Sequence, residues 1–256
     1  MPVNVTSEIG RLREVLVHAP GRELLAVTPS TRADYLYDDI MDVARAEGEH
    51  ARFVAILERF ATVHRVTDLL AEVLSDDETR QRLISDTLDV ISSEPLSREL
   101  EQLDPKELVK ALIEGKEEMP GQLTQALNEA GYVLPPLPNL FFTRDVAMAI
   151  NEHMMIGSMR YGVRWTEELI MKAIFRYNQR VASKGILYDG SREHRMNYTL
   201  EGGDVHPLRR DTLVIGFSER SSPAAIDSLA NIVFSDTEVT DLIIVIMPGA
   251  STAIHL

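Results

Sequence analysis

Two stretches of the sequence decide the fold: residues 145–188, DVAMAINEHMMIGSMRYGVRWTEELIMKAIFRYNQRVASKGILY, and residues 204–247, DVHPLRRDTLVIGFSERSSPAAIDSLANIVFSDTEVTDLIIVIM. Both start with aspartate and valine. Both continue as an apolar strand, a polar turn, a second strand, a helix with an apolar face and a closing strand. The sequence therefore predicts two consecutive ββαβ units and an α/β fold class. Because repeated units bury their faces against their neighbours, an incomplete ring of them is expected to expose apolar edges.

The two units are expected to place the same elements at equivalent positions. In the first, the predicted elements are strands at 146–150 and 153–159, a helix capped by Thr166, and a strand at 186–188. In the second, they are a strand from Val205, a strand at 212–217, a helix from Ser222-Pro223, and a strand at 242–247.

A third and less complete copy of the unit is predicted near the N-terminus. Residues 11–18 have the pattern of a strand that ends before Pro20-Gly21. A helix is expected within 39–62, because apolar residues recur there at helical spacing and form one stripe, namely Phe53, Ile56, Leu57 and Phe60.

Residues 68–134 differ from the rest of the chain because their pattern is almost entirely helical. Ser75 with Glu78 predicts a capping box, and Asp104 with Glu107 begins another helix that has proline in its first position. We therefore expect two domains. Residues 1–67 and 135–256 form a partial α/β catalytic domain, and residues 68–134 form an inserted α-helical bundle that carries no chemistry.

The composition limits the class of protein and its location. The chain has 256 residues, a formal net charge of −14 and no cysteine. An acidic surface argues against nucleic acid and anionic membranes as partners, since both are polyanions. No apolar run reaches the ~20 residues of a spanning helix, and the N-terminus has no secretory pattern, so we expect a cytoplasmic protein. The absence of cysteine excludes disulfides, thiolate metal sites and thiol catalysis by this chain.

Charged residues recur at equivalent positions of the two units. Asp145 and Asp204 introduce them, and Arg164 and Arg220 each lie between the second strand and the helix. The two glycines of Glu201-Gly202-Gly203-Asp204 permit unusual backbone geometry or a close approach to a ligand. Carboxylates bind a guanidinium by paired hydrogen bonds, and arginine binds a carboxylate in the same way. A cleft with both would suit an amino acid whose side chain is cationic.

Each of these motifs is ordinary when it is taken alone. A Glu-Gly-Gly-Asp segment is most often a turn. Lone arginines such as Arg164 and Arg220 are usually exposed surface charges, and His255 near the end of the chain has the position of a frayed residue. The functional interpretation therefore depends on the whole set.

Six short motifs follow one another in a fixed order along the chain. They are HAPGRE at 18–23, LYDDI at 36–40, LPNLFFTRD at 137–145, LEGGDV at 200–205, ERS at 219–221 and IHL at 254–256. Together they resemble the signatures of bacterial arginine deiminases, which are guanidino-group-modifying enzymes. The resemblance covers essentially the whole chain. It implies a five-bladed α/β propeller (pentein) of ββαβ units with a central active site, which would be incomplete here.

The resemblance also implies a reaction and a set of site residues. L-arginine and water would give L-citrulline and ammonia through attack of a cysteine thiolate on the guanidinium carbon, with no metal and no cofactor. Asp145 would bind the guanidinium, His255 would be the general acid and base, and Glu201 would orient that histidine. Asp204 is expected only to structure its turn. The α-amino and α-carboxylate ends of the substrate would be held by Asn139, Phe142, Arg164 and Arg220.

The sequence departs from the family pattern in two respects. The family's aspartate after histidine-leucine would be residue 257, and its nucleophilic cysteine has no counterpart in the chain. A serine or threonine hydroxyl would be a poor substitute, because it is far less acidic than a thiol. We therefore expect this chain to have no meaningful activity by itself, although L-arginine remains its expected ligand. We also expect a homo-oligomer, of a size that the sequence does not fix.

Three other readings stay open from the sequence. One is a related guanidino-modifying enzyme, such as an agmatine deiminase, a dimethylarginine hydrolase or an amidinotransferase. The helical segment at 68–134 and the pattern FTRD at 142–145 favour arginine deiminase among these. The second is a non-catalytic arginine-binding protein. The third is a truncated gene product, which ranks above the second because a partial propeller leaves strand edges unpaired.

Overall fold

The computed structural model describes residues 2–91, 96–117, 121–123, 131–192, 198–248 and 254–256. The chain forms two compact units. One consists of Met1–Leu12 with Phe142–Leu256, and the other of Arg13–Phe141. No helix in the described ranges is both long enough and apolar enough to cross a membrane.

The first copy of the repeat lies in the unit that contains residues 142–256. Its sheet has the order β5 (Ala147–Ile150), β6 (His153–Ile156) and β7 (Ile186–Asp189). β5 and β6 are antiparallel, whereas β6 and β7 are parallel and are connected through helix α8 (Trp165–Tyr177). This is the ββαβ unit that the sequence predicts.

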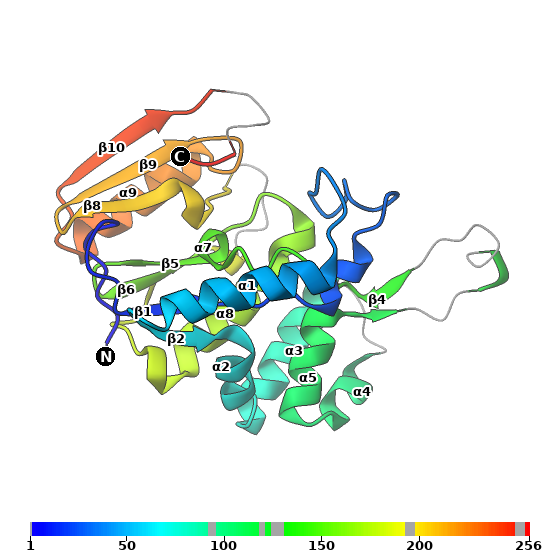
Figure 1. Cartoon of the computed structure of the whole chain (residues 1–256). Coiled ribbons are helices and arrows are strands. Elements are labelled where there is room, and N and C mark those ends of the chain that lie inside the picture. The colour runs from blue at the N-terminus through cyan, green and yellow to red at the C-terminus, as the bar shows by residue number, and fades with distance from the viewer. Residues whose placement is uncertain (1, 92–95, 118–120, 124–130, 193–197, 249–253) are drawn as a thin grey trace. The chain divides into compact units, whose positions relative to one another are not determined.

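The second copy repeats this arrangement in the same unit (Figure 1). β8 (Val205–Arg209) and β9 (Thr212–Phe217) are antiparallel, and β9 is parallel to β10 (Asp241–Ile246) after helix α9 (Pro223–Asp236). Ser222 is the N-cap residue of α9 and Pro223 its first residue, as expected. The predicted internal repeat is therefore confirmed.

One apolar core joins the two copies. Ala225, Ile226 and Leu229 of α9 belong to the same buried cluster as Tyr188 of β7 and Ile215 of β9. The third strand of the first copy is thus covered by the helix of the second. Burial of this cluster holds the two sheets together through the hydrophobic effect.

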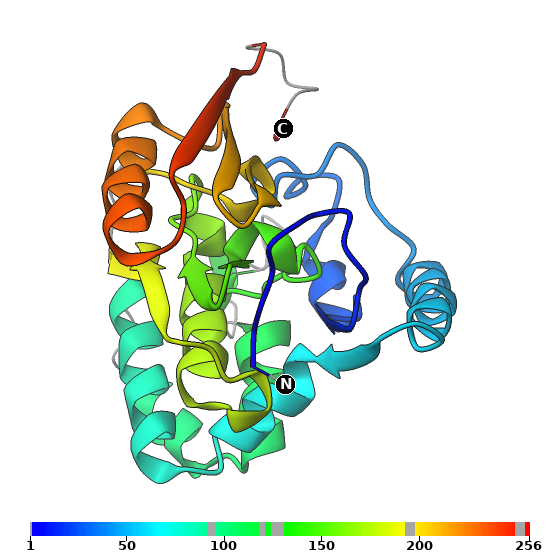
Figure 2. The ribbon, with the colours of Figure 1, turned by 90° about the vertical axis from the view of Figure 1, so that its left-hand side faces the viewer.

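The third strand of the second copy is not covered in this way. Figure 2 shows β10 (red) beside α9 (orange) at the margin of the sheet. Ile243, Ile244 and Ile246 of β10 are 47%, 44% and 77% exposed, whereas Tyr188 of the equivalent strand β7 is 4% exposed. The expectation that apolar edges are exposed is confirmed at this strand.

Several boundaries differ from those predicted. Asp145 does not begin a strand but lies in the short helix α7 (Thr143–Val146). Asp204 ends the 3-10 helix η6 (Gly202–Asp204) that precedes β8. β6 ends at Ile156 rather than at residue 159, and α8 begins at Trp165 with Arg164, not Thr166, in the N-cap position. The short helices that precede the two sheets lie against each other, because Gly202 packs directly on the backbone of Arg144 in α7.

The unit of residues 13–141 contains a strand, a helix and a second strand near its start. β1 (Glu14–Val17) pairs in parallel with β2 (Thr62–Arg65), and α1 (Val43–Leu57) lies between them in the sequence. This matches the last three elements of a ββαβ unit, as the less complete copy requires. The apolar stripe of α1 is not core: Phe53 and Ile56 are 53% and 57% exposed, and Phe60, beyond the end of the helix, is 68% exposed.

Among the described residues, four helices and a pair of short strands make up most of the rest of this unit. They are α2 (Val66–Val73), α3 (Asp77–Ile91), α4 (Ser97–Gln102), α5 (Pro105–Glu114), and the antiparallel strands β3 (Lys116–Glu117) and β4 (Tyr132–Leu134). The Asp104–Glu107 capping box of α5 is confirmed. The Ser75–Glu78 box is wrong, because the Ser75 hydroxyl donates to the Ala71 carbonyl, and Asp76 accepts from the Thr79 amide instead. The boundaries of an insert at 68–134 stay a prediction.

Candidate functional site

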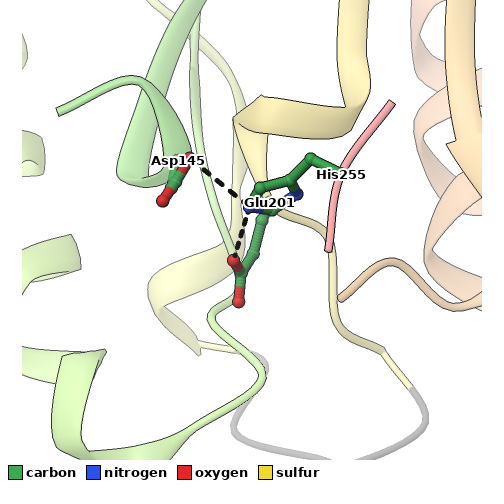
Figure 3. A group of neighbouring side chains, drawn as sticks. All are labelled: Asp145, Glu201 and His255. Carbon is green, nitrogen blue, oxygen red and sulfur yellow. Dashed lines mark ion pairs between the residues drawn. The ribbon is translucent and has the colours of Figure 1, made fainter. Parts of the chain in front are cut away.

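The imidazole of His255 lies among three carboxylates in the unit of residues 142–256. Its Nε2 atom is 3.5 Å from Asp145 Oδ1 and 3.5 Å from Glu201 Oε2, as Figure 3 shows. Its Nδ1 atom is 3.4 Å from Asp204 Oδ2. Carboxylates 51 to 110 positions from His255 in the sequence thus meet at its ring because the two repeated units place their leading aspartates side by side.

The pKa of His255 follows from these neighbours. Burial favours the neutral ring, but Asp145 and Asp204 outweigh burial and raise the pKa of His255 to about 9. Burial also raises the pKa of Asp145, yet hydrogen bonds and charge attraction from His255 and Arg164 leave that pKa below its ordinary value. The site therefore holds an imidazolium beside an ionised carboxylate at neutral pH.

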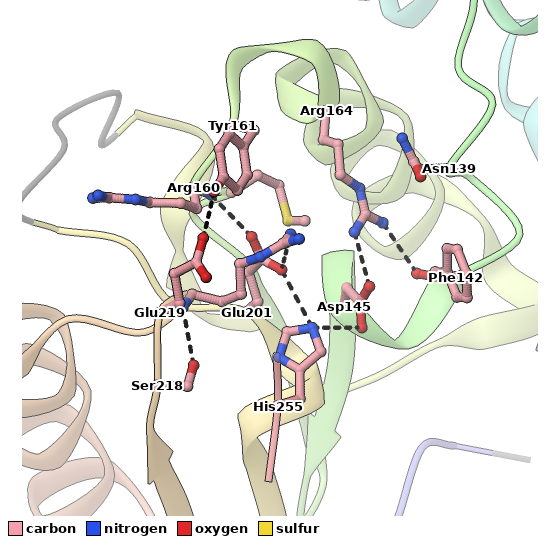
Figure 4. Close-up of polar contacts among 12 residues, drawn as sticks. Asn139, Phe142, Asp145, Arg160, Tyr161, Arg164, Glu201, Ser218, Glu219 and His255 are labelled. Carbon is pink, nitrogen blue, oxygen red and sulfur yellow. Dashed lines mark hydrogen bonds and ion pairs between the residues drawn. The ribbon is translucent and has the colours of Figure 1, made fainter. Parts of the chain in front are cut away.

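Arg164 binds Asp145 from the other side (Figure 4). It ends the 3-10 helix η3 (Gly162–Arg164), and its Nη1 donates to Asp145 Oδ2 at 2.8 Å. Its Nε and Nη2 atoms donate to Glu167 Oε2 at 3.0 and 2.9 Å, and Nη2 is 3.4 Å from the Phe142 carbonyl oxygen. The guanidinium is thus held by two carboxylates, and its side chain is only 3% exposed.

Glu201 is fully buried and is held at both oxygens. Oε1 accepts from the Arg160 amide at 3.0 Å, and Oε2 accepts from Arg220 Nη1 at 3.3 Å. The Arg220 guanidinium also lies over the ring of Tyr161, with its carbon 4.8 Å from the ring centroid. Burial raises the pKa of Glu201 above its ordinary value, although Arg164 and Arg220 oppose that effect. The Arg220 Nε atom is buried and has no hydrogen-bond partner among the residues that the structure describes.

Two further glutamates lie buried beneath the site. Glu167 and Glu168 lie in the first turn of α8, where acidic side chains interact favourably with the helix dipole. Both are fully buried, and burial raises the pKa of Glu167 to about 7 and that of Glu168 well above its ordinary range. Glu168 Oε1 accepts from the Met159 amide at 2.6 Å. The spacing of Arg164 and Glu167, three residues apart, was the one signal in the sequence that pointed to this pair.

The structure brings together most of the residues that the sequence singles out. Asp145, Arg164, Glu201, Arg220 and His255 form one connected polar network. Phe142 contributes its carbonyl oxygen to that network, and its side chain is 47% exposed. Asn139 belongs to the other compact unit, where its Nδ2 donates to the Tyr35 carbonyl at 2.9 Å. Residues that the sequence left without a site role include Tyr161, Glu167, Glu168, Ser218 and Ser221.

A cavity lies at the N-terminal end of helix α9. Its volume is about 440 Å³, and its lining includes Arg160, Ser218, Glu219 and Ser221. The Tyr161 hydroxyl donates to Glu219 at its rim. The cavity is large enough for a small organic molecule and is lined by charges of both signs.

Asp145, Glu201 and His255 also offer a set of ligand atoms for a cation, since one atom of each lies within 4.8 Å of the others. However, Arg164 already pairs with Asp145, and Arg220 with Glu201. Two guanidiniums next to these carboxylates disfavour a metal ion, because each would repel it.

Comparison with known proteins agrees with these features. The family model described as arginine deiminase matches residues 33–256. The arginine deiminase of Staphylococcus haemolyticus is 33% identical over 270 residues, with 100% of this chain and 65% of that protein covered. That of Treponema denticola is 34% identical over 273 residues, with 99% and 66% covered. The chain thus spans about two thirds of the length of these relatives.

Solved structures show the same fold at much lower identity. A cysteine-to-serine variant of DDAH from Pseudomonas aeruginosa, complexed with citrulline, superposes with a TM-score of 0.51 at 14% identity, with 96% of this chain and 64% of that chain covered. The α/β architecture is therefore shared with that enzyme. The match of a family model to most of the sequence, together with whole-chain relatives, settles its membership: the chain belongs to the arginine deiminase family.

Proposed function

We propose that this chain supplies the guanidinium-binding and acid–base part of an arginine deiminase, whose reaction converts L-arginine and water to L-citrulline and ammonia. The observation that supports this most is the placement of His255 Nε2 at 3.5 Å from both Asp145 and Glu201. A guanidinium that approached these carboxylates would lie next to a protonated imidazole. That is the arrangement needed to bind a cationic group and to give a proton to ammonia as it leaves.

In this proposal, Asp145 binds the guanidinium nitrogens while Arg164 keeps its carboxylate ionised and fixed. His255 is the general acid that protonates departing ammonia and then the base that takes a proton from water. A pKa of about 9 keeps the ring protonated at neutral pH, which suits the first of these steps. Glu201 stabilises the imidazolium by its charge.

The carboxylate end of the substrate has a specific candidate partner. Arg220 Nε is a buried donor without a hydrogen-bond partner in the described part of the chain, and the guanidinium is fixed by Glu201 and Tyr161. We propose that the α-carboxylate of L-arginine binds this donor. Arg164 and Phe142 would complete the contacts to the α-amino and α-carboxylate groups, and the role of Asn139 stays a prediction from the family resemblance.

The thiolate nucleophile of the family has to come from outside these 256 residues, because they include no cysteine. We therefore propose that the chain alone binds L-arginine weakly and does not deiminate it. The five-bladed propeller, the inserted helical domain at 68–134, a cytoplasmic location, a homo-oligomeric state and the lack of nucleic-acid and membrane partners are parts of the same proposal.

A citrulline assay tests the catalytic part. The purified chain and the arginine deiminase of Staphylococcus haemolyticus are incubated with L-arginine under the same conditions. We expect citrulline only from the relative. Citrulline formation by the chain at a comparable rate would overturn the assignment of catalysis to a thiolate.

Calorimetric titration tests the binding part. We expect L-arginine to bind the chain and Asp145→Ala to abolish this binding. Agmatine lacks the α-carboxylate. It should bind at least tenfold more weakly than L-arginine, because a hydrogen bond to a charged group is worth about 1.5–3 kcal/mol. Equal affinity for L-arginine and agmatine would refute the proposed binding of the α-carboxylate by Arg220. No binding of either would refute the substrate assignment.

A further inference from the structure

Residues 203, 204 and 216 form a seat for the segment 254–256. A Cβ atom at Gly203 would lie 2.7 Å from the Cγ and Cδ2 atoms of His255, and one at Gly216 would lie 3.0 Å from the Cβ of Leu256. The first distance is shorter than real Cβ contacts, and the second is tighter than most of them, so glycine gives the room that these contacts need. Gly203 of η6 thus leaves space for the ring of His255, and Gly216 of β9 leaves space for the side chain of Leu256.

Asp204 is the polar centre of this seat. Its side chain is fully buried, and its Oδ2 accepts from the hydroxyls of Ser218 and Ser221, both at 2.6 Å. Its Oδ1 accepts from the Leu256 amide at 3.0 Å. A hydroxyl has a single proton, so two serines that both donate to Asp204 fix it as an ionised acceptor. The same Oδ2 atom is 3.4 Å from His255 Nδ1, which is an ion-pair distance; Nδ1 forms no hydrogen bond with the described residues, so Asp204 is the carboxylate that faces this nitrogen.

The other two carboxylates at the ring are bound elsewhere. Asp145 accepts from Arg164 at 2.8 Å, and Glu201 accepts from the Arg160 amide and from Arg220. Neither of them binds the main chain of residues 254–256 in any described contact. Asp204, by contrast, accepts a hydrogen bond from the main chain of Leu256 and also lies next to the ring of His255. Orientation of a ring requires a fixed partner at the nitrogen that does not react.

We propose that Asp204, with Gly203 beneath the ring, is the positioning residue for His255. It directs Nδ1–H toward its own carboxylate and so presents Nε2 to Asp145 and Glu201. This rests on the proposed function, in which Nε2 is the reacting nitrogen. It gives Asp204 a role beyond the structure of its turn, and it limits Glu201 to electrostatic stabilisation of the ring.

The test follows the titration of His255 by NMR and needs neither substrate nor catalysis. The chain has seven histidines, and His255→Gln assigns the signal by its loss. Because Asn is isosteric with Asp but uncharged, Asp204→Asn should move the titration midpoint of His255 from about 9 toward the ordinary value of 6.5. The 15N shift of Nδ1 should also show that the neutral ring no longer carries its proton mainly on Nδ1.

A second variant keeps the test valid if Asp204→Asn does not fold. Gly203→Ala leaves the Asp204 and serine contacts intact, yet its methyl group would occupy the space of the ring, so His255 should titrate near 6.5 in this variant as well. Gly48→Ala is the matched control, because nothing lies within 4 Å of a Cβ at that position, and it should leave the midpoint unchanged.

The comparison with Glu201→Gln decides between the two carboxylates. We expect Glu201→Gln to shift the midpoint while leaving the proton on Nδ1. If Asp204→Asn and Gly203→Ala both leave the midpoint and the Nδ1 signal as they are in the unaltered chain, or if only Glu201→Gln changes the protonated nitrogen, the proposal is refuted. This comparison does not use the citrulline assay or the calorimetric titration. Failure of the proposed function in those two experiments can therefore be distinguished from failure of the role of Asp204.

Discussion

Arg164 donates to Asp145 at 2.8 Å and to Glu167 at 2.9 Å, so one buried guanidinium bridges a carboxylate of the candidate site and a carboxylate of the helix behind it. The bridge couples the position of Asp145 to helix α8. Both charges of the Arg164–Glu167 pair are almost completely removed from water, at 3% and 0% exposure of their side chains. Removal of one partner from such a pair is costly, because it leaves the other charge buried without compensation.

Glu167→Ala should therefore destabilise the protein by about 3 kcal/mol or more. Urea unfolding followed by the fluorescence of Trp165, the single tryptophan of the chain, measures this because Trp165 begins α8. Glu78→Ala is the matched control, since its pair with Arg82 is exposed and should contribute about 0–1 kcal/mol. Equal effects of the two substitutions would show that Arg164 does not depend on Glu167.

The stability of the protein should depend on the charge of His255. Its pKa is raised in the folded state to about 9 from an ordinary value of 6.5. The folded state therefore holds its proton over a range in which the unfolded chain has lost it. The stabilising contribution is fully present below pH 6.5 and is lost as the pH rises through 9.

The measurement compares the free energy of unfolding of the unaltered chain and of His255→Gln at several pH values. Groups that titrate identically in both proteins cancel in the difference. We expect the difference to be largest at and below pH 6.5 and to shrink up to pH 9. A difference that stays constant over this range would mean that the ring is not held as an imidazolium.

The glycine before Gly203 should be indispensable for packing. A Cβ at Gly202 would overlap the carbonyl oxygen of Arg144, which is backbone and has no room to move, so Gly202→Ala should destabilise the unit of residues 142–256. By contrast, Gly48 lies inside helix α1 with open space around it, and Gly48→Ala should stabilise by about 0.5–1 kcal/mol. Thermal unfolding of the two variants checks whether their changes in stability have opposite signs. If Gly202→Ala left the stability unchanged, the segments around Arg144 and Gly202 would be able to move apart.

The sequence was sufficient for the order of elements, because periodicity and repetition are properties of neighbouring residues. Each strand and helix of the two repeated copies is present, and β9 has the predicted limits of 212 and 217. The structure differs where tertiary contacts decide. Asp145 lies in a helical turn because Gly157 and Gly202 pack against the backbone of α7, and no local pattern records that contact.

The candidate site was predictable as a set of residues but not as a network. Asp145, Glu201 and His255 lie in the motifs and Arg164 lies at a repeated position, yet neither signal says which charges neutralise one another. Glu167 and Glu168 have the pattern of exposed first-turn residues, and their burial follows only from the packing of α8 under the site. The contact of Asp204 with the Leu256 amide could not be predicted, because residues 204 and 256 are far apart in the sequence and meet only in the folded chain.

The exposed strand β10 should make the chain self-associate. Ile244 and Ile246 lie on the sheet face that carries Ile215 and Phe217, but they are 44% and 77% exposed, and β10 has no neighbour on its outer edge within the described residues. An apolar strand with free backbone groups is a template for pairing with another chain. Sedimentation velocity over a range of concentrations should therefore show association, and Ile246→Lys should reduce it because a charge on the edge opposes pairing. Asn231→Lys adds the same charge at an exposed position of α9 and should leave association unchanged. Equal association in all three proteins would place the contact elsewhere than at β10.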